Sequence, residues 1–307
     1  MPHLLVTLPL LFAAFAALPF LLLWWVTPSA PALTPAAGEQ LAVLEGGRVR
    51  FQQEGTGAGT LVLLHGFNGQ LGHWDGVWSR LAGCGPRLRL DAPGFGGSYW
   101  PATDYGLEVQ ARRVIALLDA RGLARVTLVG TSMGGSLAAY IAAHYPARVA
   151  RLALLAPSGY TGALRYDGLF GLLVRPGRLN AWATRLARSA PYRTLFPRSR
   201  ALQALTVTAS YGPRWVEALP RIQAPTLIVW SRADEGVSHT SALAVRAAIR
   251  GSELLWLDAA TDHLIPQVRP ELIAALSCQL AAGAMPAVAV QRLPPGLLRA
   301  GEGLAPR

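Results

Sequence analysis

The feature of this chain that most restricts its fold is an alternation of short apolar segments with amphipathic ones. Near-continuous apolar runs occur at Thr60–Leu64, Arg125–Gly130, Arg151–Pro157 and Ala224–Trp230, and helical patterns separate most of them. Strands this apolar are buried on both faces, and the connections between them are long enough for crossover helices. The pattern therefore predicts an α/β domain over residues 41–283, with a mostly parallel, doubly wound sheet.

The alternation is interrupted by a long segment of different composition. Residues 158–223 are rich in Arg, Trp, Tyr and Pro, and we expect them to form a helical insertion. Between Tyr160 and Pro220 there are nine arginines and two acidic residues, which account for most of the net charge of +11. A solvated basic surface and a surface for anionic lipid head groups both remain open. We expect no nucleic acid as a partner, because no nucleic-acid-binding motif is visible.

The N-terminus is strongly apolar. Leu4–Val26 contains 23 residues and no charge. A helix of that length reaches about 35 Å, enough for a hydrocarbon core of about 30 Å, so we expect residues 1–27 to be a single-pass membrane anchor. The N-terminal amino group favours an N-terminus inside the cell, which places the α/β domain outside the cytoplasm. A cleaved signal peptide, with secretion of the mature protein, and a buried core helix are the alternatives.

Composition limits the remaining segments and the site types. Residues 28–40 are rich in Pro and Ala, as extended linkers are, and residues 284–307 are expected to be a flexible tail. The 52% hydrophobic and 15% charged composition excludes a disordered chain. Cys84 and Cys278 are the two cysteines, too few for a disulfide-rich scaffold or a four-cysteine zinc site.

A G-x-S-x-G pentapeptide occupies residues 130–134. The pentapeptide alone is weak evidence, but it follows a β-branched strand and opens a predicted helix. A serine on such a turn projects above the sheet, and the flanking glycines remove Cβ atoms that would clash. The positive end of the helix also favours a developing anion. The pattern predicts that Ser132 is a nucleophile.

A serine nucleophile requires a base, usually a histidine oriented by a carboxylate. His263 follows the last predicted strand, at the edge where parallel sheets form their sites, so we predict it as the base. The remaining histidines lie in the N-terminal stretch, at turns or on predicted helices: His3, His65, His73, His144 and His239.

The carboxylate is expected after a neighbouring strand. Asp234 and Glu235 lie together in the loop after such a strand, and Asp234 is preferred. Asp91 also ends a strand, where capping a turn is its simpler role. Asp258 and Asp262 are too close in sequence to the predicted base to reach its far ring nitrogen easily.

An acyl-transfer transition state also needs donors for its oxyanion. The backbone N–H of Met133, next to the predicted nucleophile, is expected to be one of them. The second is expected from Phe67 in the loop "HGFNG", where Gly66 allows a close approach of the backbone. An ordinary glycine-rich turn is the alternative interpretation of that loop.

These segments together resemble the α/β-hydrolase fold superfamily, in its lid-bearing branch of esterases, lipases and C–C hydrolases. The matching pieces run from about residue 41 to residue 282 in the family's order: "LVLLHGFNG", "LDAPGFGGS", "LVGTSMGGSLAAY", "PTLIVWSRADEGV" and "TDHLIPQVRPELI". The resemblance implies that residues 158–223 are a helical lid. By position it implies Ser132 as nucleophile, Asp234 as acid, His263 as base, and Phe67 and Met133 as donors of the oxyanion amides.

Two positions depart from the family's pattern. Thr131 stands where His, Asn or Tyr is usual, and Asp262 stands where Gly is usual. Neither departure removes a catalytic group, and we expect Asp262 to change the pH response. The expected function is a serine hydrolase that cleaves an ester-type bond of a small or lipid substrate through an acyl-enzyme. No cofactor and no metal are implied. A C–C hydrolase, a thioesterase, an aminopeptidase and a non-catalytic binding protein of the same fold remain as alternatives.

Overall fold

The computed structural model describes residues 17–25, 35–44, 46–99, 104–160, 168–175, 177–196, 199–258 and 260–286. Its strands are β1 (Glu39–Leu44), β2 (Gly47–Glu54), β3 (Leu61–Leu64), β4 (Arg87–Leu90), β5 (Val126–Thr131), β6 (Val149–Leu155), β7 (Thr226–Ser231) and β8 (Glu253–Leu257).

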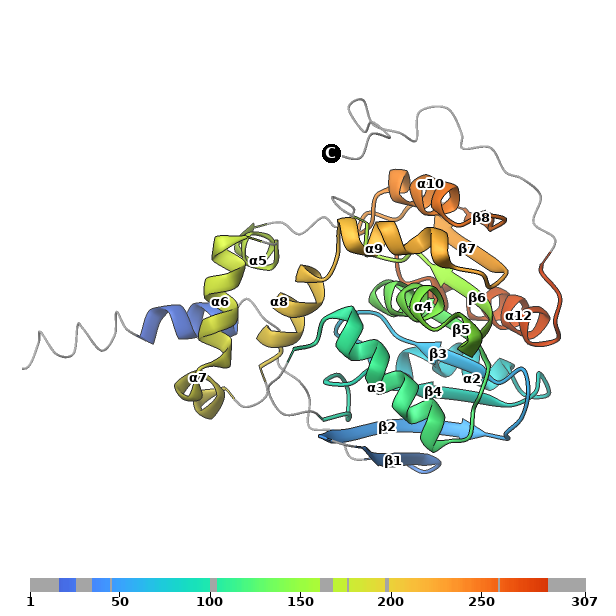
Figure 1. The fold of residues 1–307 in the computed structure, drawn as a ribbon, viewed down its shortest axis with the longest axis horizontal. Coiled ribbons are helices and arrows are strands. Elements are labelled where there is room, and N and C mark those ends of the chain that lie inside the picture. Colours follow the sequence, from blue (N-terminus) through green and yellow to red (C-terminus); the bar gives the residue numbers. More distant parts are fainter. Residues whose placement is uncertain are drawn as a thin grey trace, which may run out of the picture.

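The strands form one sheet in the order β1-β2-β4-β3-β5-β6-β7-β8 (Figure 1). β1 pairs antiparallel with β2, and β2 pairs antiparallel with β4. All the other neighbours pair in parallel. The predicted mostly parallel sheet is therefore confirmed.

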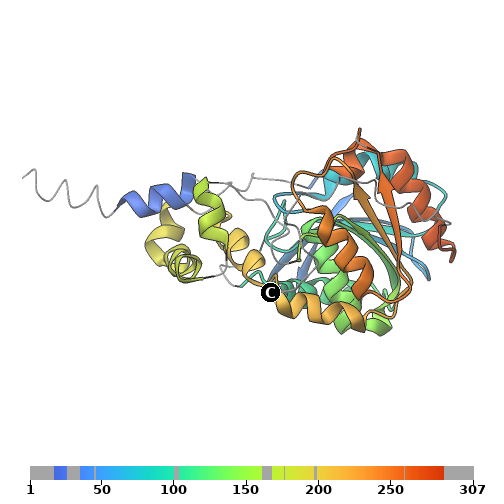
Figure 2. The same ribbon diagram turned by 90° about the horizontal axis from the view of Figure 1, so that it is seen from above.

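The helices around the sheet follow the predicted alternation, with short helical turns between them. They are η1 (Leu71–Trp74), α2 (Asp75–Arg80), α3 (Leu107–Ala120), α4 (Met133–His144), η2 (Pro146–Arg148), α10 (His239–Ala248), α11 (Ile265–Val268) and α12 (Pro270–Ala281). α2 packs against α12, and α3 packs against α4 (Figures 1 and 2).

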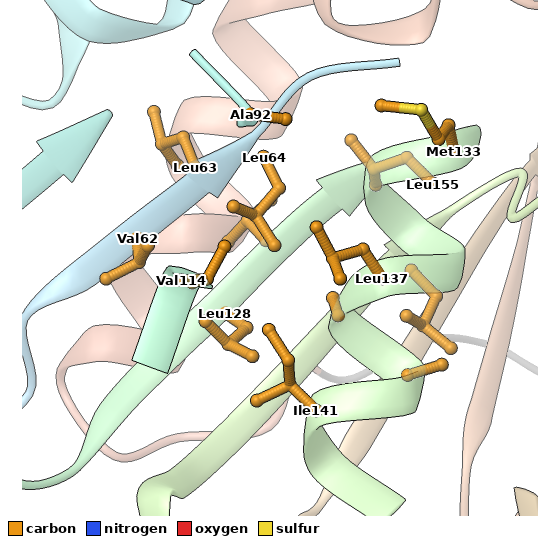
Figure 3. Close-up of a cluster of buried hydrophobic side chains, with 14 of the residues drawn as sticks. Val62, Leu63, Leu64, Ala92, Val114, Leu128, Met133, Leu137, Ile141 and Leu155 are labelled. Carbon is orange, nitrogen blue, oxygen red and sulfur yellow. The ribbon is translucent and has the colours of Figure 1, made fainter. Parts of the chain in front are cut away.

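The core lies where the central strands meet α3 and α4. Every residue of β3 and β5 is buried, which explains why these segments contain continuous apolar runs. Figure 3 shows Leu64, Leu128, Leu137 and Ile141 converging between the strands and α4, and all four are at most 1% exposed. This packing anchors the ends of β3 and β5, which carry the loops of the candidate site.

The elements that the structure describes between β6 and β7 are helices. They are α5 (Gly168–Val174), α6 (Arg178–Arg188), α7 (Ala190–Leu195), α8 (Ala201–Ala209), α9 (Pro213–Ala218) and η3 (Leu219–Arg221). We call residues 168–221 the insertion and α5–α7 its outer helices, because they stand away from the sheet (Figures 1 and 2).

α8 joins the insertion to the core. The backbone N–H of Tyr105 donates to Thr206 Oγ1 at 2.9 Å, and that of Leu107 donates to Ser210 Oγ at 3.1 Å. Gln203 Nε2 donates to the carbonyl oxygen of Gly94 at 3.0 Å. Because these bonds run along the length of α8, this helix is held more firmly to the core than the outer helices are.

The structure contradicts the prediction of a membrane anchor at the N-terminus. Residues 17–25 form a helix that packs on the insertion: the Phe20 and Tyr192 rings lie 6.1 Å apart, those of Trp24 and Phe196 lie 5.5 Å apart, and Leu23 is 2% exposed. No helix in the described part of the chain is both long and apolar enough to cross a bilayer, and this overturns the predicted single-pass localisation. Residues 1–16, which carry most of the expected anchor, lie outside the described ranges.

The edges of the domain differ slightly from the expectation. β1 begins at Glu39, inside the predicted linker of residues 28–40, because residues 39–44 pair with β2. Residues 28–34 of that linker and residues 287–307 of the predicted tail lie outside the described ranges.

A disulfide joins Cys84 to Cys278, with their Cα atoms 5.2 Å apart and 194 residues of separation. It ties the turn after α2 to α12. Two cysteines so far apart in sequence carry no local signal of contact, so this disulfide cannot be predicted from the sequence.

Candidate active site

Ser132 lies at the junction of β5 and α4 in a strained backbone conformation. Its φ is 52° and its ψ is −120°, a region that residues with a Cβ rarely occupy. The neighbouring glycines permit the tight turn: a Cβ on Gly134 would lie 2.2 Å from the carbonyl oxygen of Leu64, and one on Gly130 would lie 2.2 Å from the carbonyl oxygen of Gly134. The turn is therefore the strand-to-helix elbow that the pentapeptide predicts.

The structure brings Ser132, His263 and Asp234 together. His263 Nε2 lies 2.9 Å from Ser132 Oγ, and His263 Nδ1 lies 2.8 Å from Asp234 Oδ2. The Asp234 side chain is fully buried, whereas that of His263 is 26% exposed. The second oxygen of Asp234 accepts backbone N–H groups from Gly236 at 2.9 Å and Val237 at 2.8 Å. These bonds fix the carboxylate, so that Oδ2 can hold the imidazole with Nε2 directed at the serine.

The other carboxylates considered from the sequence are occupied elsewhere. Asp91 is buried, its oxygens accept the Leu71 and Gly97 backbone N–H groups, and its carboxylate forms an ion pair with Arg50. Asp258 pairs with Arg269, and Asp262 accepts the Leu264 N–H at 2.7 Å. Glu235 is exposed.

Two of the remaining histidines, His65 and His144, have structural surroundings. His65 is fully buried, its Nδ1 lies 2.7 Å from the Gly66 carbonyl oxygen and its Nε2 accepts the Ala92 N–H at 2.9 Å. Burial lowers the pKa of His65 to about 4, so the ring is neutral at pH 7. His144 stacks on Tyr140, and its Nδ1 lies 2.9 Å from that residue's carbonyl oxygen.

The predicted oxyanion donors flank Ser132. A Cβ on Gly66 would lie 3.2 Å from Ser132 Cβ, so the loop after β3 passes directly beside the elbow. Within the described part of the chain, the backbone N–H groups of Phe67 and Met133 have no hydrogen-bond acceptor. Two free donors at the ends of β3 and β5 are what an anionic oxygen on a Ser132 adduct would need.

Phe67 belongs to a tight turn. Gly69 N–H donates to the Gly66 carbonyl oxygen at 3.1 Å, and Asn68 has a φ of 58°. The third residue of a type II turn requires a positive φ, which Asn tolerates better than most residues. We call residues 66–69 the oxyanion turn.

The insertion contributes residues near this turn that the sequence analysis did not single out. Arg200, the residue before α8, donates from Nη1 to Asn68 Oδ1, and its guanidinium carbon lies 5.7 Å from the centroid of the Phe95 ring. Arg200 is one of the nine arginines for which the sequence predicts a basic surface, yet it is 1% exposed. Trp215 Nε1 also donates to the Ser136 carbonyl oxygen at 3.1 Å, next to the elbow. The sequence contains no local signal for either contact.

No group of three or more His, Cys, Asp or Glu residues in the described ranges could hold a metal ion. All the residues of the site come from loops at the carboxyl ends of β3, β5, β7 and β8, the edge at which parallel sheets bind ligands.

Comparison with known proteins adds three findings. The alpha/beta hydrolase fold family matches residues 59–190. The 2-hydroxy-6-oxononadienedioate/2-hydroxy-6-oxononatrienedioate hydrolase of Paraburkholderia phymatum is 32% identical over 237 residues, 66% of this chain and 81% of that protein. The dihydrolipoyllysine-residue acetyltransferase component of the acetoin cleaving system of Cupriavidus necator is 37% identical over 129 residues, 42% of this chain, and the chain spans only 34% of its length.

A solved structure is also similar over most of the chain. The crystal structure of a membrane phospholipase A, described as a bacterial virulence factor, is 27% identical, with a TM-score of 0.62. The match covers 92% of this chain and 100% of that one. The similarity therefore extends beyond the sheet into the insertion.

Proposed function

Because this chain belongs to the alpha/beta hydrolase fold family, we propose that it is a serine hydrolase that cleaves an ester-type bond of a small or lipid substrate. The observation that carries the proposal is the hydrogen-bonded series from Ser132 Oγ through His263 to the buried Asp234. An activated serine requires a base within hydrogen-bond reach and a third group that orients the base.

Acylation follows from this geometry. Ser132 Oγ attacks the ester carbonyl carbon while His263 Nε2 takes the hydroxyl proton. Asp234 accepts the hydrogen bond from Nδ1–H and stabilises the imidazolium that forms. The carbonyl oxygen becomes an anion between the N–H groups of Phe67 and Met133. When the tetrahedral adduct collapses, the C–O bond to the alcohol breaks and the imidazolium protonates the leaving oxygen.

Deacylation uses the same groups. Water gives a proton to His263 Nε2 and attacks the acyl carbon, and the second tetrahedral adduct releases the carboxylic acid and returns the proton to Ser132 Oγ. The partial exposure of the His263 ring supports this step, because water must reach Nε2. Every step is carried by side chains and backbone groups of the chain itself.

Two observations support a lipid ester within this class. The similarity to the membrane phospholipase A covers 92% of this chain. The outer helices expose large apolar side chains, and residues 168–196 contain five arginines and no acidic residue. We infer that the outer helices contact the surface of an aggregated anionic lipid substrate. The exposed apolar residues are Leu172, Leu179, Trp182 and Leu195.

The experiment that tests the proposal is labelling with a fluorophosphonate probe, followed by acyl esters of graded chain length. We expect the wild type to be labelled and to hydrolyse esters, and Ser132→Ala to lose both activities. Ser79→Ala, an exposed serine on α2, is the matched control and should behave as the wild type. Absence of labelling in the folded wild type would favour the non-catalytic binding protein.

A second panel separates the alternatives that share the serine mechanism. It contains a thioester, an aminoacyl amide and 2-hydroxy-6-oxononadienedioate, the compound named for the Paraburkholderia relative. A kcat/KM for any of these that exceeds the value for every ester would overturn the ester assignment while keeping the serine mechanism.

A further inference from the structure

Arg200 is a buried cation that the hydrolytic mechanism leaves without a role. It is 1% exposed, and its Nε has no hydrogen-bond partner within the described residues. Burial lowers the pKa of its guanidinium, with Asp91 acting against that effect through space. Both Asp91 oxygens are already used by Leu71, Gly97 and Arg50, so Arg200 has no carboxylate of its own. Burying a charge in this way opposes folding.

The contacts that Arg200 does make converge on the oxyanion turn. Its Nη1 donates to the side-chain oxygen of Asn68, the residue after Phe67. Its guanidinium lies near the ring of Phe95, and that ring meets the Phe67 ring edge-on at a centroid distance of 5.6 Å. Arg200 therefore contacts the oxyanion turn directly at Asn68 and, through the Phe95 ring, at Phe67, whose N–H is the proposed oxyanion donor.

The backbone of Arg200 is firmly held against the core. Its carbonyl oxygen accepts the Ala204 N–H at 2.9 Å, which joins Arg200 to α8. α8 is in turn bonded to the core through Gln203, Thr206 and Ser210, as described above. A guanidinium on this helix can hold the oxyanion turn at a constant distance from Ser132.

We propose that Arg200 is a positioning residue for the proposed hydrolase reaction. Through Asn68 and Phe95 it holds the Phe67 N–H where the anionic oxygen of a Ser132 adduct develops. This role rests on the proposed function. It also means that stabilisation of the transition state depends on how the insertion packs against the core. An oxyanion donor acts by being fixed before the reaction, so a loosened turn lowers kcat more than it raises KM.

The principal test is Arg200→Met in the full chain, assayed with a short soluble ester. Removing an oxyanion donor lowers kcat by about 10²–10³-fold, and we expect a displaced donor to lower it by about 10–100-fold with little change in KM. Inhibition by phenylboronic acid, whose serine adduct is tetrahedral, should weaken by the same factor as kcat/KM. The thermal midpoint should not fall, because the variant removes an unpaired buried charge.

Further variants separate positioning from structural support. Asn68→Gly keeps a residue that accepts the positive φ and removes the acceptor, so it should reproduce the loss of kcat. The double variant with Arg200→Met should lose no more than the worse single variant, because the two side chains act through one contact. Arg200→Lys should recover most of the activity, since an ammonium on a long stem can still donate to the Asn68 side chain. Arg246→Met, at an exposed position on α10 and outside the insertion, is the matched control and should leave kcat unchanged.

The outcomes distinguish the two proposals. A wild type that is not labelled by the fluorophosphonate contradicts the proposed function itself. A labelled, active wild type with unchanged kcat in Arg200→Met or in Asn68→Gly contradicts the role of Arg200 alone. Losses in the two single variants that multiply in the double variant, or a loss in Arg200→Met that accompanies a lowered thermal midpoint, would also overturn it. If Arg200→Met does not fold, the Asn68→Gly result decides.

Discussion

The sheet beneath Ser132 and the outer helices of the insertion place their apolar side chains in opposite environments. Every residue of β5 is buried, and Leu128 is 0% exposed, whereas Trp182 on α6 is 46% exposed and Leu195 on α7 is 65% exposed. In the core, burial of apolar surface stabilises the fold and holds the site loops in place. On the outer helices the same residue types remain available to a ligand or surface. The apolar residues that stabilise the fold are therefore distinct from those exposed for contact with another surface, and α8 connects the two regions.

The prediction with the largest expected effect concerns the catalytic residues that the sheet holds in place. Asp234→Asn should keep the fold and lower kcat by about 10⁴-fold, because the amide cannot hold the Nδ1–H tautomer of His263. Steady-state kinetics with a soluble ester measure this, and circular dichroism checks the fold. Glu235→Gln is the adjacent control and should retain activity, because Glu235 is exposed. Equal losses in both variants would contradict the choice of Asp234.

The positions of the site residues could be inferred from the sequence because each follows a strand of a parallel sheet. Ser132 lies between glycines after β5, and Asp234 and His263 follow β7 and β8, so their chain positions alone predict one shared edge. Arg200 could not be inferred in this way. Its burial depends on α8 docking against loops more than 100 residues earlier in the chain, and one Arg among nine carries no mark of that contact.

The N-terminal stretch and the disulfide were missed for a related physical reason. An apolar stretch predicts burial but not the surface that buries it, and residues 17–25 pack on Tyr192 and Phe196. The disulfide depends on α2 and α12 meeting on one face of the sheet, which two isolated cysteines do not indicate. The sequence thus predicts the periodic core well and the contacts made by the insertion poorly.

The disulfide provides the next largest effect. Replacing both cysteines by Ser should lower the free energy of unfolding by about 4 kcal/mol, because the closed loop is long and its closure restricts the unfolded chain. Urea unfolding of the oxidised wild type and the double variant measures the difference. Activity at low temperature should persist, because Cys84 precedes the amino end of β4, whereas the site residues follow the carboxyl ends of the parallel strands. A destabilisation below about 1 kcal/mol would show that helix packing alone secures this side of the sheet.

His65 makes the stability of the folded protein depend on pH, and its contribution is lost as the pH falls. Its pKa is about 4 in the folded protein and 6.5 in the unfolded chain, so its contribution to stability is complete above pH 6.5. As the pH falls from 6.5 to 4 the unfolded chain binds the proton first, and about 3 kcal/mol of stability is lost. Urea midpoints across this range should decline less steeply in His65→Gln than in the wild type. His144→Gln, at an exposed position, is the control and should keep the wild-type slope.

The smallest effect on stability is expected on the outer helices. Trp182→Ser and Leu195→Ser should each change the free energy of unfolding by less than about 0.5 kcal/mol, because both side chains are largely exposed. Leu128→Ala, in the core, should cost about 2–5 kcal/mol and serves as the comparison.

If the outer helices receive a lipid aggregate, the two serine variants should hydrolyse a dispersed short ester normally and a long-chain ester in anionic vesicles more slowly. Because each side chain removed from such a surface contributes through its buried apolar area, the combined variant should be slower than either single variant. Unchanged rates on vesicles in the combined variant would mean that these exposed side chains have no part in substrate recognition, and the preference for a lipid ester would then rest on similarity to the phospholipase alone.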